Sequence, residues 1–253
     1  MKNKKGVVFG VANEKSIAWA IAQKLHQEGA HIIISYQKSH FEKTIRQLTG
    51  SSGNKIDAVI CDVSDEEQIQ KAQKDIISRL GKIDFIVHSV AFGPRMEFQG
   101  RFLDTTREGF RISQEISTYS FTAIIRNFEK YLNDGASLLT ITFEGSQRVV
   151  PGYNLMGPAK ASLETSVRYL AYELGQRQIR VNAISAGPIA TSASNWIPDF
   201  QDILDHFKQI VPLKRNISQS EVANAAAFLL SDMAAGITGN ILYVDAGYHI
   251  LAP

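Results

Sequence analysis

The stretch Gly6-Val-Val-Phe-Gly-Val-Ala-Asn-Glu-Lys-Ser-Ile-Ala18 passes from a short apolar run through a turn into a helical pattern. The run Gly6–Phe9 predicts a buried parallel strand, because such strands are apolar on both faces. Gly10 opens the turn, and Ser16 stands where the next helix should begin. Amides at a helix N-terminus attract phosphate, so a pyrophosphate could bind to Ser16 and the Ile17 amide. The turn lacks further fingerprint glycines, so an ordinary loop capped by Ser16 is the alternative.

Short apolar runs alternate with helical patterns along the rest of the chain. The runs predict strands at Gly6–Phe9, His31–Ser35, Ala58–Cys61, Phe85–His88, Leu138–Thr142, Arg180–Ile184 and Ile241–Val244. Apolar residues three or four apart predict helices at Ile17–Glu28, Glu66–Leu80, Ser113–Leu132, Ala159–Leu174 and Glu221–Leu229. Ser218 and Glu221 match a capping box. The alternation predicts an α/β fold, a Rossmann-type doubly wound parallel sheet of about seven strands with helices on both faces and ligands beyond the carboxyl ends of the strands.

Composition narrows the class of protein. The 253 residues are 44% hydrophobic and no linker or repeat divides them, so we expect one domain spanning 1–253. A net charge of +2 without a basic stripe gives no reason to expect a nucleic-acid partner. Cys61 is the only cysteine, which excludes an internal disulfide and fits a small buried core residue in a reducing compartment. We expect no metal site, no signal peptide and no membrane anchor.

Tyr153 and Lys160 stand seven positions apart in a segment with helical periodicity. Two helical turns would place them on one face, where both side chains could line one pocket. A fixed ammonium favours the phenolate, so the pair predicts a proton-transfer site of a reductase, with the pKa of Tyr153 below its usual value near 10. The alternative is a half-buried helix tyrosine beside a solvated lysine.

Turns that follow three other predicted strands lie where a dinucleotide would bind. Asp62 could hold an adenine or cap the next helix, and His88 is more often a hydrogen-bonded core histidine than a catalytic one. Gln37 and Lys38 end the second strand, where an acidic residue would select NAD and a cation would accept the 2'-phosphate of NADP. A neutral amide followed by a lysine leaves the cofactor open.

Five groups of residues carry a resemblance to a known family: Gly10-Val-Ala-Asn with Ser16-Ile-Ala-Trp19, Thr106-Arg-Glu-Gly-Phe110, Ile116-Ser-Thr-Tyr-Ser120, Tyr153-Asn-Leu-Met-Gly157 with Ala159-Lys-Ala-Ser-Leu-Glu164, and Arg180-Val-Asn-Ala-Ile-Ser-Ala-Gly-Pro-Ile189. Together they resemble the enoyl-acyl carrier protein reductases of bacterial fatty-acid synthesis, a divergent branch of the short-chain dehydrogenase/reductases. The likeness runs from about Lys5 to Gly247.

The resemblance implies a reaction and a set of site residues. Hydride would pass from NADH or NADPH, with NADH slightly favoured, to the β-carbon of a trans-2-enoyl thioester on acyl carrier protein. Tyr153 would hydrogen-bond the thioester carbonyl as it becomes an enolate, and Lys160 would hold the nicotinamide ribose. The implied cofactor residues are Gly10, Ser16, Ile17, Gln37, Asp62, Val63, Val90, Lys160, Ile189, Ala190, Thr191, Ser192 and Ala193. The expected substrate residues are Gly93, Phe143, Tyr153 and Trp196.

The chain also departs from the family pattern. Phe143 stands where the family has a second tyrosine, ten residues before the first. The missing hydroxyl implies either reduced activity or a changed substrate, unless the ring only walls the pocket. Ala190 replaces a common arginine, and Pro198, Gln201 and Asp202 replace basic residues of some members, which puts docking of an acidic carrier in doubt.

Two other readings remain open. A carbonyl reductase would use a hydroxyl thirteen positions before the tyrosine, and Thr140 stands there. A cofactor-binding protein that has lost catalysis would follow from the Phe143 change. Residues 191–207, with Trp196 and Phe200, are expected to form a lid over the acyl chain. By the same resemblance we expect a cytoplasmic homotetramer.

Overall fold

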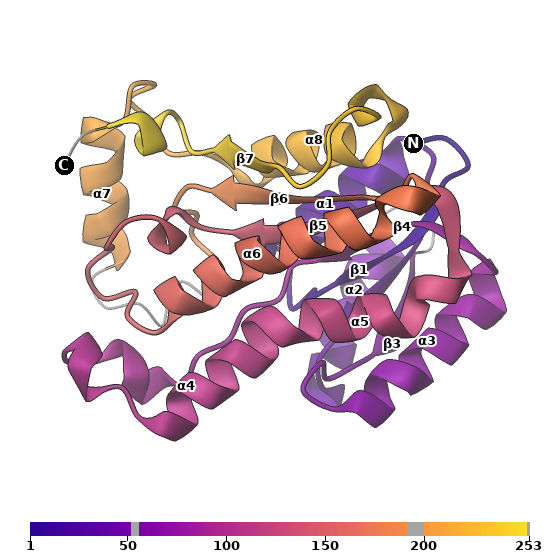
Figure 1. Cartoon of the computed structure of the whole chain (residues 1–253), viewed down its shortest axis with the longest axis horizontal. Coiled ribbons are helices and arrows are strands. Elements are labelled where there is room, and N and C mark those ends of the chain that lie inside the picture. The colour runs from indigo at the N-terminus through magenta and orange to yellow at the C-terminus, as the bar shows by residue number, and fades with distance from the viewer. Residues whose placement is uncertain (52–55, 192–199, 252–253) are drawn as a thin grey trace.

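The computed structural model describes residues 1–51, 56–191 and 200–251. Its seven strands form one parallel sheet in the order β3-β2-β1-β4-β5-β6-β7. They are β1 (Lys5–Phe9), β2 (His31–Tyr36), β3 (Asp57–Ile60), β4 (Ile83–His88), β5 (Leu132–Thr142), β6 (Arg180–Ala186) and β7 (Ile241–Val244). The doubly wound architecture is thereby confirmed, with a strand at each of the seven predicted places (Figure 1).

Eight α-helices connect and cover the strands within the described residues. They are α1 (Ile17–Gln27), α2 (Glu42–Ser51), α3 (Glu66–Leu80), α4 (Arg107–Gln114), α5 (Ser120–Phe128), α6 (Met156–Leu174), α7 (Phe200–Ile210) and α8 (Gln219–Leu230). A π-helical turn, Glu115–Tyr119, joins α4 to α5 without a break. None of these helices is both long and apolar enough to span a bilayer.

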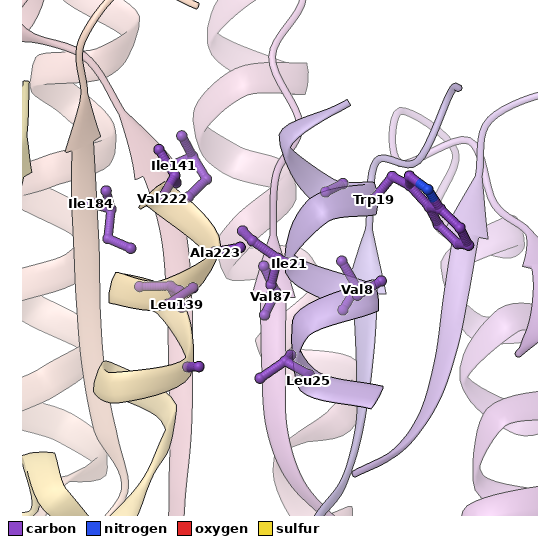
Figure 2. Packing of buried hydrophobic residues seen from close by; sticks show 14 of the residues in the cluster. Val8, Trp19, Ile21, Leu25, Val87, Leu139, Ile141, Ile184, Val222 and Ala223 are labelled. Atoms are coloured by element: carbon purple, nitrogen blue, oxygen red, sulfur yellow. The ribbon is translucent and has the colours of Figure 1, made fainter. Parts of the chain in front are cut away.

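Alternate residues of each strand face opposite layers of helices. Val8 belongs to the core beneath α1 and α8, whereas its neighbours Val7 and Phe9 pack with the side of α3, α5 and α6. Figure 2 shows the first core, where Ile21 and Leu25 of α1 lie over the central strands beside α8. Strands buried on both faces are continuously apolar, which is why apolar runs located them correctly.

The helices differ from the prediction in several places. The helix expected at Ser113–Leu132 is the run from α4 to α5: Thr106 caps its start by accepting from the Gly109 amide, and β5 already begins at Leu132. The helices α2 and α7 were not predicted. Pattern reasoning missed α7 although Phe200, Ile203, Leu204 and Phe207 have the spacing of an amphipathic helix. The capping box is confirmed, with Ser218 accepting from the Glu221 amide and the Glu221 carboxylate accepting from the Ser218 amide.

Candidate active site

Two adjoining cavities open at the carboxyl ends of the strands. The larger has a volume of about 460 Å³ and the smaller about 290 Å³. Six residues line both of them: Ile17, Ala91, Phe92, Ile141, Lys160 and Thr191. The two cavities therefore meet along a shared wall, and Lys160 is the cation on that wall.

Most of the predicted cofactor residues line the smaller cavity. Its lining includes Gly10, Ser16, Ile17, Gln37, Asp62, Val63, Val90, Lys160 and Thr191. Gly10 has a φ of +100°, and a Cβ there would lie 2.1 Å from the carbonyl oxygen of Ser89. A glycine is thus required for the chain to leave β1 this close to the end of β4.

Hydrogen bonds shape the wall of this cavity at two places. The Ser16 hydroxyl accepts from the amides of Ala12 and Asn13 at 3.1 and 3.0 Å. It therefore fixes the turn before α1 and makes no side-chain cap to the helix, contrary to the simpler alternative. At the end of β2, the Gln37 amide donates to Asp62 Oδ2 at 3.0 Å. These two polar groups thus come together from different strands.

The larger cavity has a mostly apolar wall. Among its lining residues are the predicted Gly93, Phe143, Tyr153, Lys160 and Ile189, together with Phe98, Met156 and Phe200. Its polar groups are few, as expected of a small-molecule pocket with a limited number of orienting contacts. Tyr153 lines this cavity only, whereas Lys160 reaches both.

Tyr153 lies before the helix rather than on it, which corrects the helical-face argument. Helix α6 begins at Met156, and Asn154 has a φ of +41°, so the backbone at this point is not helical. The Met156 amide donates to the Tyr153 carbonyl at 3.1 Å, which closes a turn. Pro158 is tolerated in the first turn of α6 because amides there have no intrahelical partner. The tyrosine and Lys160 still reach one cavity, from a turn and a helix respectively.

The expected lowering of the Tyr153 pKa is wrong in this structure. Burial raises the pKa of the phenol above its usual value, and the Glu164 carboxylate raises it further. Burial lowers the pKa of Lys160 to about 8, against an opposing contribution from Glu164. The Lys160 ammonium donates to the Ile141 carbonyl at 2.8 Å. Tyr153 is consequently a neutral hydrogen-bond donor near pH 7, the form that an incipient oxyanion requires.

Phe143 packs directly against the phenol. Its ring centroid lies 4.9 Å from that of Tyr153 with an interplanar angle of 67°, an edge-on arrangement. On another side of the phenol is Gly145, where a Cβ would come within 2.5 Å of Tyr153 Cδ1. The orientation of the phenol is thus fixed by an aromatic ring and by a position without a side chain.

His88 is a core residue, as its sequence context predicted. It is fully buried, with Nδ1 2.9 Å from Thr140 Oγ1 and Nε2 2.8 Å from Ser120 Oγ. Burial lowers the pKa of the imidazole to about 3, so it is neutral at pH 7. Thr140 is equally buried and lines neither of the two cavities, so its hydroxyl serves His88 and not a substrate.

Some predicted residues lie elsewhere. Ala190 lines neither cavity, although its carbonyl accepts from the Gln219 amide at 3.2 Å. Ser192, Ala193 and Trp196 lie outside the described residues, as does most of the first half of the expected lid. Cys61 is buried as expected, and burial raises the pKa of its thiol to about 12.

Sequence reasoning missed several lining residues. Phe41 lines the smaller cavity, and Phe98 and Met156 line the larger. Phe41, Phe98 and Met156 reach the site from connecting segments or a helix start, and no local pattern separates them from ordinary core residues.

The chain is similar in sequence to known proteins over nearly its whole length. The family model described as enoyl-(acyl carrier protein) reductase matches residues 10–249. Enoyl-acyl-carrier-protein reductase (NADH) 1 of Rhizobium meliloti is 48% identical over 249 residues, covering 98% of this chain and 91% of the relative. The corresponding NADH-named FabI of Bacillus cereus is 45% identical over 252 residues, covering 99% and 98%.

Solved structures of enoyl-acyl carrier protein reductases have the same fold as this chain. The crystal structure of the Bacillus cereus reductase with NADP+ and indole naphthyridinone has a TM-score of 0.97 at 45% identity, covering 100% of this chain and 98% of that one. The NADH reductase of Aquifex aeolicus has a TM-score of 0.96 at 41% identity, with the same coverage. The family model, the relatives and the solved structures all match this chain over nearly its whole length, so the chain belongs to the enoyl-acyl carrier protein reductase family.

Proposed function

We propose that this chain reduces trans-2-enoyl thioesters of acyl carrier protein to saturated acyl thioesters in fatty-acid synthesis, with NADH as the electron donor. One observation supports this proposal most directly. The two cavities meet at Lys160, and Tyr153 lines the larger, apolar cavity. The smaller cavity suits a dinucleotide and the larger suits an acyl chain.

The smaller cavity fits a dinucleotide in its lining as well as in its position. Gly10 lets the chain leave β1 close to the end of β4, and the Ser16 hydroxyl and the Ile17 amide at the start of α1 would bind a pyrophosphate. Gln37, Asp62 and Val63 lie at a strand edge suited to the adenosine end. Val90, Lys160 and Thr191 would hold the nicotinamide half, with Ile189 reaching it from the larger cavity. When bound, the reduced nicotinamide supplies the hydride.

Tyr153 would act on the substrate carbonyl. Its pKa is raised, so the phenol keeps its proton and donates a hydrogen bond to the oxygen as negative charge develops there. A preorganised donor of this kind typically contributes about 3 kcal/mol, or roughly a hundredfold in rate. Gly93 and Phe143 would bound the acyl chain.

The carbonyl-reductase alternative loses support from the position of Thr140. That hydroxyl is buried at the His88 contact and does not reach the cavity where a ketone would bind. The impaired-paralogue alternative depends on Phe143, whose ring packs against Tyr153 without a hydroxyl. Retention of both Tyr153 and Lys160 in the shared site favours catalysis.

The coenzyme preference and the assembly complete the proposal. The relatives above are named as NADH enzymes, while the Bacillus cereus structure was solved with NADP+. We propose NADH for this chain because Gln37, which pairs with Asp62, supplies no charge for a 2'-phosphate, and the neighbouring Lys38 does not line the cavity. We also propose a single domain in which residues 191–207 form the substrate lid, a homotetramer, and a cytoplasmic location.

The test is oxidation of NADH and of NADPH with trans-2-enoyl thioesters on acyl carrier protein and on coenzyme A. Turnover by the native chain, faster with NADH and the carrier-linked substrate, would support the proposal. Phe143→Tyr is the matched variant, since it adds one hydroxyl beside Tyr153. Activity only in that variant would instead support the impaired-paralogue alternative.

A further inference from the structure

Glu164 is a buried carboxylate that the proposed reaction does not use. It is 1% exposed and lies on α6 four residues after Lys160, which is 4% exposed. Residues four apart on a helix lie one above the other, with Cβ atoms about 5–6 Å apart. The two opposite charges therefore share one buried face of the helix.

Two hydrogen bonds hold the carboxylate in place. Thr142 donates from its hydroxyl to Oε1 at 2.7 Å, and the Gln147 amide donates to Oε2 at 2.8 Å. Thr142 also lines the larger cavity. Glu164 thus joins α6 to the end of β5, next to the expected substrate.

Several other titratable groups surround this pair. They are His88 from β4, Tyr153 from the turn before α6, Glu144 and Arg148 after β5, and Tyr243, Asp245 and His249 from β7 and the residues that follow it. Arg148 contacts Glu144 at 3.2 Å, and His249 contacts Asp245 at 2.9 Å. Arg148 and His249 thus have carboxylate partners of their own, and Glu164 is the carboxylate that shares a buried helix face with Lys160.

Lys160 needs such a partner. A buried ammonium is costly unless it is compensated by an opposite charge, and the Lys160 ammonium donates its hydrogen bond to the neutral Ile141 carbonyl. We propose that Glu164 is a positioning residue whose buried charge keeps the proton on Lys160 and on Tyr153. The effect of Glu164 on both pKa values, upward in each case, agrees with this role.

The role of Glu164 in catalysis rests on the proposed function, but its effect on the charge of Lys160 does not. That effect can therefore be tested without turnover. The pKa of Lys160 in the cofactor-free protein can be measured by competitive acetylation with acetic anhydride, with the modified peptide quantified by mass spectrometry. We expect a midpoint near 8 in the native chain. In Glu164→Gln, which keeps the size and a hydrogen-bond acceptor, the midpoint should fall by about one pH unit.

Glu173→Gln is the matched control, because it removes the same charge from an exposed position of α6. Its midpoint should equal that of the native chain. If the native chain is an active reductase, the alkaline limb of its kcat profile should move down by the same unit in Glu164→Gln, with a roughly tenfold lower rate above pH 9. An unchanged Lys160 midpoint in folded Glu164→Gln would overturn the inference, whether or not the chain turns over.

A second measurement covers the case in which Glu164→Gln does not fold. The stability cost of removing Glu164 is then compared with and without Lys160, by urea unfolding of Lys160→Met and of Lys160→Met/Glu164→Gln at pH 8. If Glu164 is the countercharge of Lys160, the double variant should fold. Removing Glu164 should then lower the free energy of unfolding less in the Lys160→Met background, because no ammonium is left uncompensated. If the double variant also fails to fold while Lys160→Met does, the carboxylate serves only its hydrogen bonds and the inference is wrong.

Discussion

Gly145→Ala should displace the phenol of Tyr153 without touching either cavity directly. Gly145 lines neither cavity, yet a Cβ at this position would lie 2.5 Å from Tyr153 Cδ1 and 3.3 Å from Phe143 Cδ1. Contacts of a Cβ below 3.0 Å essentially never occur, and those up to 3.4 Å are tight. The phenol ring must therefore move by roughly 0.5–0.9 Å to make room.

The expected size of the effect follows from that movement. A misplacement of about 1 Å can cost roughly a hundredfold in rate, equivalent to about 2.7 kcal/mol in the activation free energy. Binding of NADH should change less than about twofold, because the new methyl group does not enter the smaller cavity. Overpacking should also lower the free energy of unfolding by about 1–3 kcal/mol.

Single-turnover reduction of a trans-2-enoyl thioester on acyl carrier protein measures the chemical step, and fluorescence titration measures NADH affinity. Gly175→Ala is the control, because Gly175 is in the right-handed helical region and a Cβ there meets nothing within 4 Å. A folded Gly145→Ala protein that reduces substrate at the native rate would refute the steric argument. A loss of NADH affinity as large as the loss of rate would refute the claim that the effect is confined to the phenol.

Three other changes have definite expected outcomes. Lys160→Met should weaken NADH binding roughly 10–100-fold and slow reduction, through loss of a hydrogen bond from a charged group; unchanged kinetics would remove Lys160 from the site. Arg215 lowers the pKa of Glu221 to about 2, so the stability from this carboxylate is present above its unfolded pKa near 4.5 and lost as pH falls toward 2. Glu221→Gln should therefore cost about 0.5–1 kcal/mol in urea unfolding at pH 7 and progressively less below pH 4; a constant cost would contradict this account. Cys61, whose thiol pKa is raised to about 12 by burial, should resist iodoacetamide at pH 8 until the chain is unfolded, and rapid labelling of the native protein would show that the thiol is accessible.

The sequence predicted the sheet better than the connections. Apolar runs such as Leu138–Thr142 identified all seven strands, since burial on both faces leaves a continuous signal. Helix α2 was missed because its residues are mostly polar, and the π-helical turn 115–119 has no sequence signature distinct from an α-helix. The start of α6 was predicted three residues late.

The residues of the site were easier to predict than their physical state. Tyr153 and Lys160 do share a cavity, but the helical spacing that suggested it does not apply, because Tyr153 precedes the helix. Motif spacing likewise predicted a lowered pKa for Tyr153, whereas burial and Glu164 raise it. Spacing along a chain does not report how much water or which distant charge surrounds a group.

The sequence by itself determined the alternation of strands and helices, the glycine that β1 needs before its turn, and the residue types available for hydride-transfer chemistry. Each of these depends on local backbone preferences or on a short periodic pattern. Only the tertiary structure decided that Thr140 serves His88, that Gly145 makes room for Tyr153, and that the Glu164 carboxylate accepts from Thr142 of β5. These relations join residues from different elements, and their consequences depend on distance and burial, which chain order does not encode.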